Sequence, residues 1–225
     1  MPLRAAIPLL NPTVHGGEAL APATLAARIP PGRLVEITTG HPASAQTTAA
    51  VACLVHAQAR GETAAWVQPE GGSLYPPDLA QSGVDLDALV VIHVPSGAGP
   101  HARFKAAEIL LRSGGFGMVV LDLTSSSATL DARTQDRMRT ARGQGLGDAA
   151  WQSRLFALAR EHGSWLLLLT PANAQLGSLV ALRIEPRRTR DGHGRFAIEH
   201  VVHKDKTGLC ASLAPDACRG PAGLV

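Results

Sequence analysis

Aromatic residues are scarce in this sequence of 225 residues, in which Phe, Trp and Tyr together account for 4%. Hydrophobic residues nevertheless make up 45% of the chain and charged residues 17%, a composition typical of folded globular proteins and not of disordered ones. The core must therefore be aliphatic, built mainly from alanine, valine, leucine and isoleucine. The length is sufficient for one domain of substantial size with additional tails.

Cysteine is also rare. The chain has three, Cys53, Cys210 and Cys218, and this odd, small number argues against a disulfide framework. Cys53 lies in an apolar stretch of helical composition and is interpreted as a small core residue. Cys210 and Cys218 lack the CxxC spacing of zinc sites, so we expect no bound metal.

Long hydrophobic runs and a strong net charge are both absent. No stretch reaches the about 18 consecutive apolar residues of a membrane span, and the apolar patch at residues 5–10 is too short for a signal peptide. We therefore expect a cytoplasmic protein without membrane contact. The net charge of +3 and the pI near 9.1 permit contact with nucleic acid but do not require it.

Apolar stretches that resemble buried strands alternate with stretches of helical composition along most of the chain. We expect strands at residues 34–38, 63–67, 89–94, 118–123 and 165–170, and helices at residues 47–59, 102–112 and 149–162. Continuous apolar strands separated by helices indicate parallel strands that are buried on both faces. The predicted fold is therefore α/β, a doubly wound, mainly parallel sheet flanked by helices.

The pattern changes after residue 176. Two further strands, at residues 178–185 and 195–203, are joined by a polar loop at residues 187–194, which predicts an antiparallel hairpin at the sheet edge. The chain thus divides into an N-terminal arm, a core domain and a loose C-terminal tail, with the boundaries 1–31, 32–206 and 207–225.

The loop after the first predicted strand has the position of a phosphate-binding loop. In the motif G-x-x-x-x-G-K-[ST], backbone N–H groups and the lysine hold phosphates at the start of a helix. Gly40 and Thr47 fit this motif, and Thr48 follows as the last residue of the relic loop, but Ala45 replaces the second glycine and Gln46 replaces the lysine. Losing one charge-assisted contact of this kind costs roughly 2–4 kcal/mol. Taken alone, the segment also fits an ordinary strand-to-helix turn, so the neighbouring sequence must decide.

Three flanking stretches resemble the bacterial RecA recombinases, and they occur in the same order. They are residues 32–37 (GRLVEI), residues 83–89 (GVDLDAL), and residues 107–114 (AEILLRSG) followed by residues 119–122 (VVLD). A weaker likeness extends from about Gly32 to Lys206. The resemblance implies a RecA-like core whose phosphate-binding loop is a relic.

The same resemblance implies roles for single residues. Asp122 matches the aspartate that supports the magnesium shell, Glu70 matches the glutamate that orients the attacking water, and Thr47 matches the hydroxyl residue that contacts magnesium. Gln46 breaks this set, because a glutamine brings no charge to the phosphates. We therefore expect Glu70 and Asp122 to be relic positions in a protein that is not an enzyme and has no nucleotide cofactor. The alternatives are a solvated turn residue for Glu70 and a loop-capping carboxylate for Asp122.

The loops that bind DNA in the RecA family are also different in this sequence. The family has a mobile loop after its fifth strand that contacts single-stranded DNA, whereas here Thr170 is followed by only five residues, 171–175, before the next segment. The preceding loop, residues 125–148, keeps its length, and its four arginines are candidates for weak contact with DNA: Arg133, Arg137, Arg139 and Arg142. No aromatic residue lies among them to stack on bases. The short N-terminal arm lacks the long helix and strand through which RecA polymerises.

A RecA-like core without its lysine, its second DNA loop and its polymerisation arm resembles the ImuA family, which are accessory proteins of bacterial SOS mutagenesis cassettes. This resemblance implies a non-catalytic role in translesion synthesis after DNA damage. The implied partner is an ImuB-like Y-family polymerase homologue, and RecA itself is a second candidate. The tail at residues 207–225 is a candidate interaction segment.

Other functions remain open at this stage. A weak ATPase would need a positive charge from elsewhere, such as Lys105 or an arginine of a neighbouring chain. A single-strand DNA-binding RecA paralogue in recombinational repair and a SulA-like cell-division inhibitor are further alternatives. The hairpin carries a candidate basic patch for DNA or an acidic partner, although a solvated face is an equally good interpretation; the patch comprises Arg183, Arg187, Arg188, Arg190, Lys204 and Lys206.

Overall fold

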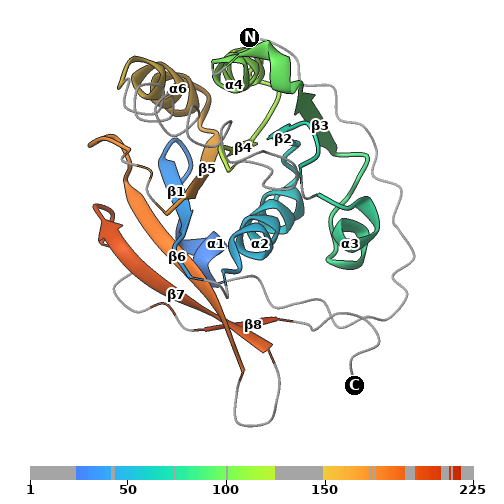
Figure 1. Ribbon diagram of the computed structural model, residues 1–225, viewed down its shortest axis with the longest axis vertical. Coiled ribbons are helices and arrows are strands. Elements are labelled where there is room, and N and C mark those ends of the chain that lie inside the picture. The colour runs from blue at the N-terminus through green and yellow to red at the C-terminus, as the bar shows by residue number, and fades with distance from the viewer. Residues whose placement is uncertain are drawn as a thin grey trace, which may run out of the picture.

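The computed structural model describes residues 24–41, 44–72, 74–99, 101–124, 149–172, 174, 176–190, 196–208, 213 and 215–218. The first half of the chain contributes α1 (Thr24–Arg28), β1 (Leu34–Thr39), α2 (Gln46–Ala59), β2 (Ala64–Pro69), α3 (Pro76–Gln81), β3 (Leu89–Val94) and the 3₁₀ turn η1 (Ser96–Ala98). The second half contributes α4 (Ala102–Ser113), β4 (Met118–Asp122), α6 (Ala149–His162), β5 (Trp165–Pro171), β6 (Leu182–Arg190), β7 (Phe196–Asp205) and β8 (Asp216–Cys218) (Figure 1).

One eight-stranded sheet organises the fold, with the strand order β3-β2-β4-β5-β1-β6-β7-β8. The first six strands in this order, β3, β2, β4, β5, β1 and β6, pair in parallel. Strand β7 pairs antiparallel with both β6 and β8. The predicted doubly wound α/β fold with an antiparallel edge hairpin is therefore confirmed. The parallel strands are apolar because helices cover both of their faces.

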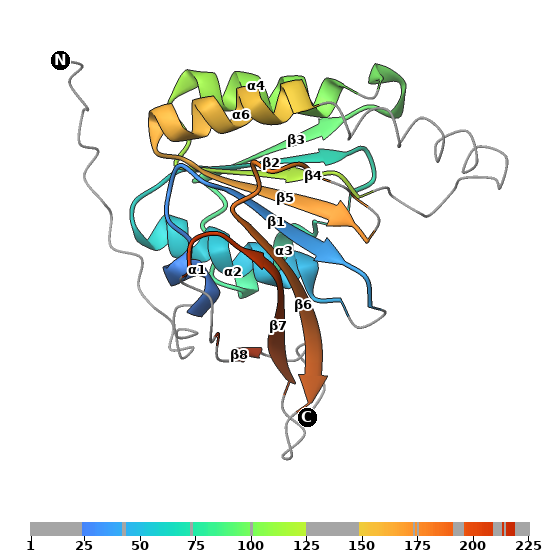
Figure 2. The same ribbon diagram turned by 90° about the vertical axis from the view of Figure 1, so that its left-hand side faces the viewer.

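Two helical layers enclose the sheet. Figure 2 shows α4 and α6 side by side on one face, and α1, α2 and α3 on the other. Each face has its own apolar cluster, one that includes Leu54 of α2 and Trp66 of β2 and one that includes Leu111 of α4 and Leu155 of α6. The few aromatic residues include a stacked pair between α4 and α6, Phe104 and Trp151, whose ring centroids are 4.1 Å apart.

Three elements differ from the sequence prediction by more than one or two residues at their ends. The strand expected at residues 178–185 is β6, which starts at Leu182 and continues to Arg190, because Arg187–Arg190 keep pairing with Glu199–Phe196 of β7. The segment 207–225 is not entirely a loose tail, since β8 adds a strand to the hairpin. The short helix α3 was not predicted, although prolines suit its first turn.

The arm predicted at residues 1–31 ends in α1, which packs on the core through its buried residues Leu25 and Ala26, and Ile29 follows in the same cluster. None of the described helices combines the length and apolarity that a bilayer crossing requires.

A buried carboxylate ties three strands together at the centre of the sheet. Glu36 of β1 is fully buried. Its Oε1 accepts a hydrogen bond from Thr170 Oγ1 of β5 at 2.8 Å, and its Oε2 accepts one from Arg183 Nε of β6 at 2.6 Å. A buried charge is tolerated when it is paired and hydrogen-bonded in this way. Glu36 therefore fixes β6 beside β1.

We predict that Glu36→Gln lowers the free energy of unfolding by about 3 kcal/mol, because it leaves the Arg183 guanidinium without its carboxylate. Urea denaturation followed by circular dichroism measures the change. Glu161→Gln on the exposed surface of α6 is the control and should change stability by less than about 0.5 kcal/mol. Equal losses in the two variants would contradict the proposed role of Glu36.

Candidate functional site

The predicted relic residues lie along one edge of the sheet. Gly40 follows β1, Glu70 follows β2 and Asp122 ends β4. These strands are parallel; β2 and β4 are neighbours, and only β5 lies between β4 and β1. Their carboxyl ends therefore face the same crevice, which is where open α/β sheets bind ligands.

Gln46 starts α2 and is directed into the protein. Its side-chain Nε2 donates hydrogen bonds to the carbonyl of Thr170 at 3.0 Å and to the carbonyl of Ile37. The residue is 8% exposed. A lysine at this position of the motif would extend toward phosphate; the Gln46 amide instead ties α2 to the ends of β1 and β5.

Two backbone amides in the described part of the loop are also engaged by the protein. Ser44 N donates to His41 O at 3.0 Å, and Ala45 N donates to Pro186 O of β6 at 2.9 Å. Ser44 further forms an antiparallel bridge with Arg187. Phosphate-binding loops work because such N–H groups point at the ligand. Here β6 takes the Ala45 donor that an anion would need, so the loop is closed against the edge hairpin.

The carboxylate of Glu185 lies close to Gly40, the first residue of the loop. Glu185 of β6 is 4% exposed, and a Cβ placed on Gly40 would lie 3.4 Å from Glu185 Oε1. Glu185 Oε2 accepts hydrogen bonds from Arg187 Nη2 at 3.1 Å and from His203 Nε2 at 3.0 Å.

The hydrogen bond from Arg187 is the main reason that the pKa of Glu185 lies below its usual range; His203 adds to the effect, and burial opposes it. Glu185 is therefore ionised at neutral pH, and its charge is paired with the Arg187 guanidinium beside Gly40.

Asp122 caps the loop that follows β4. Its Oδ1 accepts hydrogen bonds from Thr124 N at 2.8 Å and from Thr124 Oγ1 at 2.5 Å. Burial raises the pKa of the Asp122 carboxyl, although the hydrogen bonds from Thr124 and the charge of Arg103 oppose this shift. Arg103 of α4 donates to the Asp122 and Thr124 carbonyls at 2.8 and 3.3 Å. The described contacts of Asp122 therefore shape the chain and leave its Oδ1 occupied.

The remaining predicted residues are less involved in this network. Glu70 is exposed after β2, and Thr47 and Thr48 are half-buried in the first turn of α2. Lys105 lies on the exposed side of α4, where its Nζ is 3.5 Å from Glu108 Oε2. The arginines proposed for DNA contact, Arg133, Arg137, Arg139 and Arg142, lie outside the described residues.

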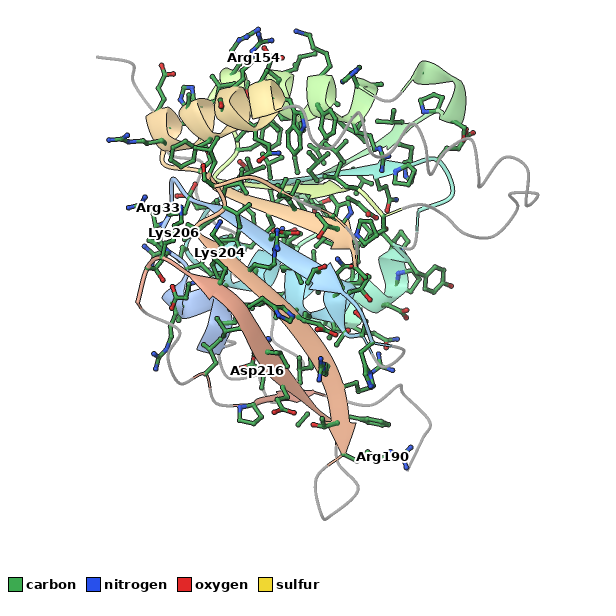
Figure 3. All side chains as sticks on the ribbon, turned by 60° about the vertical axis from the view of Figure 1, so that its left-hand side comes forward. Arg33, Arg154, Arg190, Lys204, Lys206 and Asp216 are labelled. Atoms are coloured by element: carbon green, nitrogen blue, oxygen red, sulfur yellow. The ribbon has the colours of Figure 1, made fainter. Side chains whose placement is uncertain are left out.

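The structure divides the predicted basic patch of the hairpin into separate groups. Arg183 pairs with Glu36, and Arg187 pairs with Glu185. Lys204 and Lys206 donate to the carbonyls of Gly177 and Ser178 at the start of the hairpin. Figure 3 shows these two lysines near Arg33 and far from Arg190, which lies over the ring of Phe196. The six residues therefore do not form one surface.

The two histidines of β7 have different partners. His203 contacts Glu185, whereas His200 contacts Asp216 Oδ2 of β8 at 2.7 Å. In the part of the chain that the structure describes, no cluster of three or more metal-ligating side chains occurs.

Sequence reasoning missed the residues of β6 that close the loop, Glu185 and Pro186. Both are about 140 positions away from the loop along the chain, as the bridge from Ser44 to Arg187 illustrates. The sequence offered one indication, which is that Glu185 and Pro186 are unusual residues for a strand interior. Only the placement of β6 beside β1 gives that indication a meaning.

The strand order and the crevice between β1, β5 and β4 define a RecA-like α/β domain. The comparison of sequences agrees: residues 9–156 match the family described as the RecA N-terminal domain. The chain belongs to this family.

Individual relatives point the same way. The chain is 38% identical over 93 residues to the protein RecA of Francisella tularensis subsp. novicida, and equally to those of the subspecies tularensis and holarctica. The aligned stretch covers 41% of this chain but only 24% of each relative. The similarity thus concerns one part of RecA and not the whole protein.

We predict that Gln46→Leu destabilises the protein by about 2 kcal/mol, because the buried carbonyls of Ile37 and Thr170 lose a donor. Chemical denaturation measures the loss. Gln58→Leu makes the same substitution in the same helix, where the hydrogen bonds to Asp85 are exposed. Water replaces these bonds, so this control should lose less than about 1 kcal/mol. If the Gln46 variant is as stable as the control, the hydrogen bonds from the Gln46 amide to Ile37 and Thr170 do not stabilise the fold.

Proposed function

We propose that this protein is a non-catalytic, RecA-related accessory protein of bacterial DNA-damage tolerance, and that it acts by binding other proteins. The observation that carries the proposal is the closed loop, in which Ala45 N donates to Pro186 O and the Gln46 amide donates to strand carbonyls. The described part of this loop has given its Ala45 amide to β6, and it lacks the cation that holds a nucleotide in related domains.

Electrostatics favour the same conclusion. A nucleotide triphosphate would meet no lysine at position 46, and the cation beside Gly40, Arg187, is already paired with Glu185. Opening the loop would also break the bridge between Ser44 and β6. The loss of a charge-assisted contact and the loss of a buried hydrogen bond each cost on the order of 1–3 kcal/mol.

The proposed pathway rests on family membership together with the particular departures from RecA. The absent lysine, the short segment after β5 and the RecA-like core together resemble ImuA, which supports a role in SOS mutagenesis and translesion synthesis. The proposed partners are an ImuB-like Y-family polymerase homologue and RecA. Because the curated relatives are matched over only 24% of their length, none of the activities of whole RecA is transferred to this chain.

We predict no saturable binding of ATP with magnesium at concentrations below about 1 mM. A titration with a fluorescent ATP analogue and isothermal calorimetry measure this, with an intact RecA in the same buffer as the positive control. Saturable binding that Thr47→Ala and Asp122→Ala abolish would show that the closed loop opens for nucleotide.

We predict saturable binding of the full chain to at least one proposed partner, with a micromolar or lower Kd. Calorimetric titration against the purified polymerase homologue and RecA of the same organism tests this. Absence of binding to both proteins would overturn the proposed function.

A further inference from the structure

The outer surface of α4 and α6 carries an excess of positive charge. Lys105 and Arg112 of α4 and Arg154 of α6 surround one carboxylate, that of Glu108, and their side chains are 59%, 59% and 64% exposed. Among the described residues, the three cations of this cluster share one carboxylate, which leaves an excess of two positive charges. The other acidic residue of these two helices is Glu161, in the last turn of α6. We call the surface formed by Lys105, Ile109, Arg112 and Arg154 the basic helix face.

Glu108 holds the three cations in place. Its carboxylate is 7% exposed and lies 3.5 Å from Lys105 Nζ and 3.6 Å from Arg154 Nη1, and it is hydrogen-bonded to Arg112 Nη2. Burial raises the pKa of this carboxyl, but the three cations outweigh burial and hold the pKa below its usual range. Fixing long basic side chains in advance reduces the entropy that a partner must otherwise overcome.

An apolar side chain lies among these cations. Ile109 is 57% exposed, and it shares one side of α4 with Lys105 and Arg112, at the spacings of four and three residues that bring helix side chains together. The described strands lie only on the inner side of these helices in Figure 2, and Figure 3 shows Arg154 directed outward from α6. A single exposed isoleucine is unremarkable, but one between two cations of the same helix side, with Arg154 held by the neighbouring Glu108, is matched to a partner of definite chemistry.

We propose that the basic helix face docks an acidic segment of a partner protein, with one apolar side chain of that segment on Ile109 and its carboxylates on Lys105, Arg112 and Arg154. The inference rests on the proposed function, because it assigns the surface through which a protein partner binds. From Lys105 to Arg112 the face is about 10 Å long, which suits roughly two turns of an amphipathic helix.

Charge alone would also attract nucleic acid, but the apolar and aromatic residues favour a protein. A phosphate backbone gains nothing from Ile109, whereas an apolar side chain gains burial. Single-stranded nucleic acid binds by stacking on exposed aromatic rings, and the aromatic residues of these helices, Phe104, Trp151 and Phe156, are buried or half-buried. The face is therefore assigned to an acidic peptide segment, and nucleic acid becomes an outcome of the test.

The test compares three variants of the full chain. Arg154→Gln removes one charge, and Ile109→Ser removes the apolar contact without disturbing any ion pair. Arg160→Gln is the matched control, since it removes the same charge from an exposed position in the same helix, outside the cluster around Glu108. Each protein is titrated with the polymerase homologue, with RecA and with two probes. The probes are a fluorescent acidic amphipathic peptide of about 15 residues with leucines on one side, and an oligothymidine of similar charge.

We expect Arg154→Gln and Ile109→Ser each to weaken binding of the acidic peptide and of a partner by about 5-fold, and the double variant by about 25-fold if the effects add. The control should stay within about 2-fold of wild type. Raising the salt concentration should weaken wild type more than Arg154→Gln.

The remaining outcomes distinguish a failure of this inference from a failure of the proposed function. Partner binding that both variants leave unchanged overturns this inference and leaves the proposed function standing. A peptide bound through the face while neither partner binds overturns the proposed function and keeps the inference. No binding of the peptide or of a partner through this face, or oligothymidine binding with the same sensitivity to the variants, overturns the inference. Thermal unfolding of each variant confirms that the protein is folded.

Discussion

The buried carboxylate of Glu36 is the interaction on which the arrangement of this molecule depends. It joins β1 to Thr170 of β5 and to Arg183 of β6, so the edge hairpin is held against the parallel sheet. Once β6 has this position, Pro186 and Glu185 necessarily lie next to the loop between β1 and α2. The state of the loop is thus a consequence of strand pairing as well as of its own sequence.

The closed loop shows how a binding site can be lost in more than one physical way. The substitution of a lysine removes charge, but the glutamine in its place also gains a structural role by donating to two strand carbonyls. The loop amide of Ala45 donates to a carbonyl within the protein, and the Glu185 carboxylate lies beside Gly40 at the start of the loop. In this protein the amide of Ala45 and the side chain at position 46 stabilise the fold, whereas in related domains the groups at these positions bind the phosphates of the ligand. On the opposite side, α4 and α6 present fixed cations to solvent, so the surface suited to an anionic partner lies away from the crevice.

Sequence reasoning succeeded where the determining interactions are local. The alternation of apolar runs and helical stretches predicted β1 to β5 and the helices α2, α4 and α6 within a few residues, because burial on both faces requires continuous apolar strands. It was wrong about β6, where charged Arg187, Arg188 and Arg190 looked like a loop but continue the ladder with β7. It was also wrong to treat the whole tail as loose, since β8 is held by the exposed edge of β7 and by the contact between Asp216 and His200. Both errors concern the antiparallel end of the sheet, where polar residues carry no alternating apolar pattern.

The sequence by itself determined the layered α/β fold, the place of the loop at the end of β1, and the loss of its lysine and second glycine. It did so because these features depend on residues that are neighbours in the chain. Only the tertiary structure decided that the loop is closed and that Gln46 is buried. The reason is physical: the carbonyl of Thr170 is 124 positions from Gln46, and the charges gathered around Glu108 come from two helices that meet only in the fold. No local pattern records which donor will meet which acceptor across such separations.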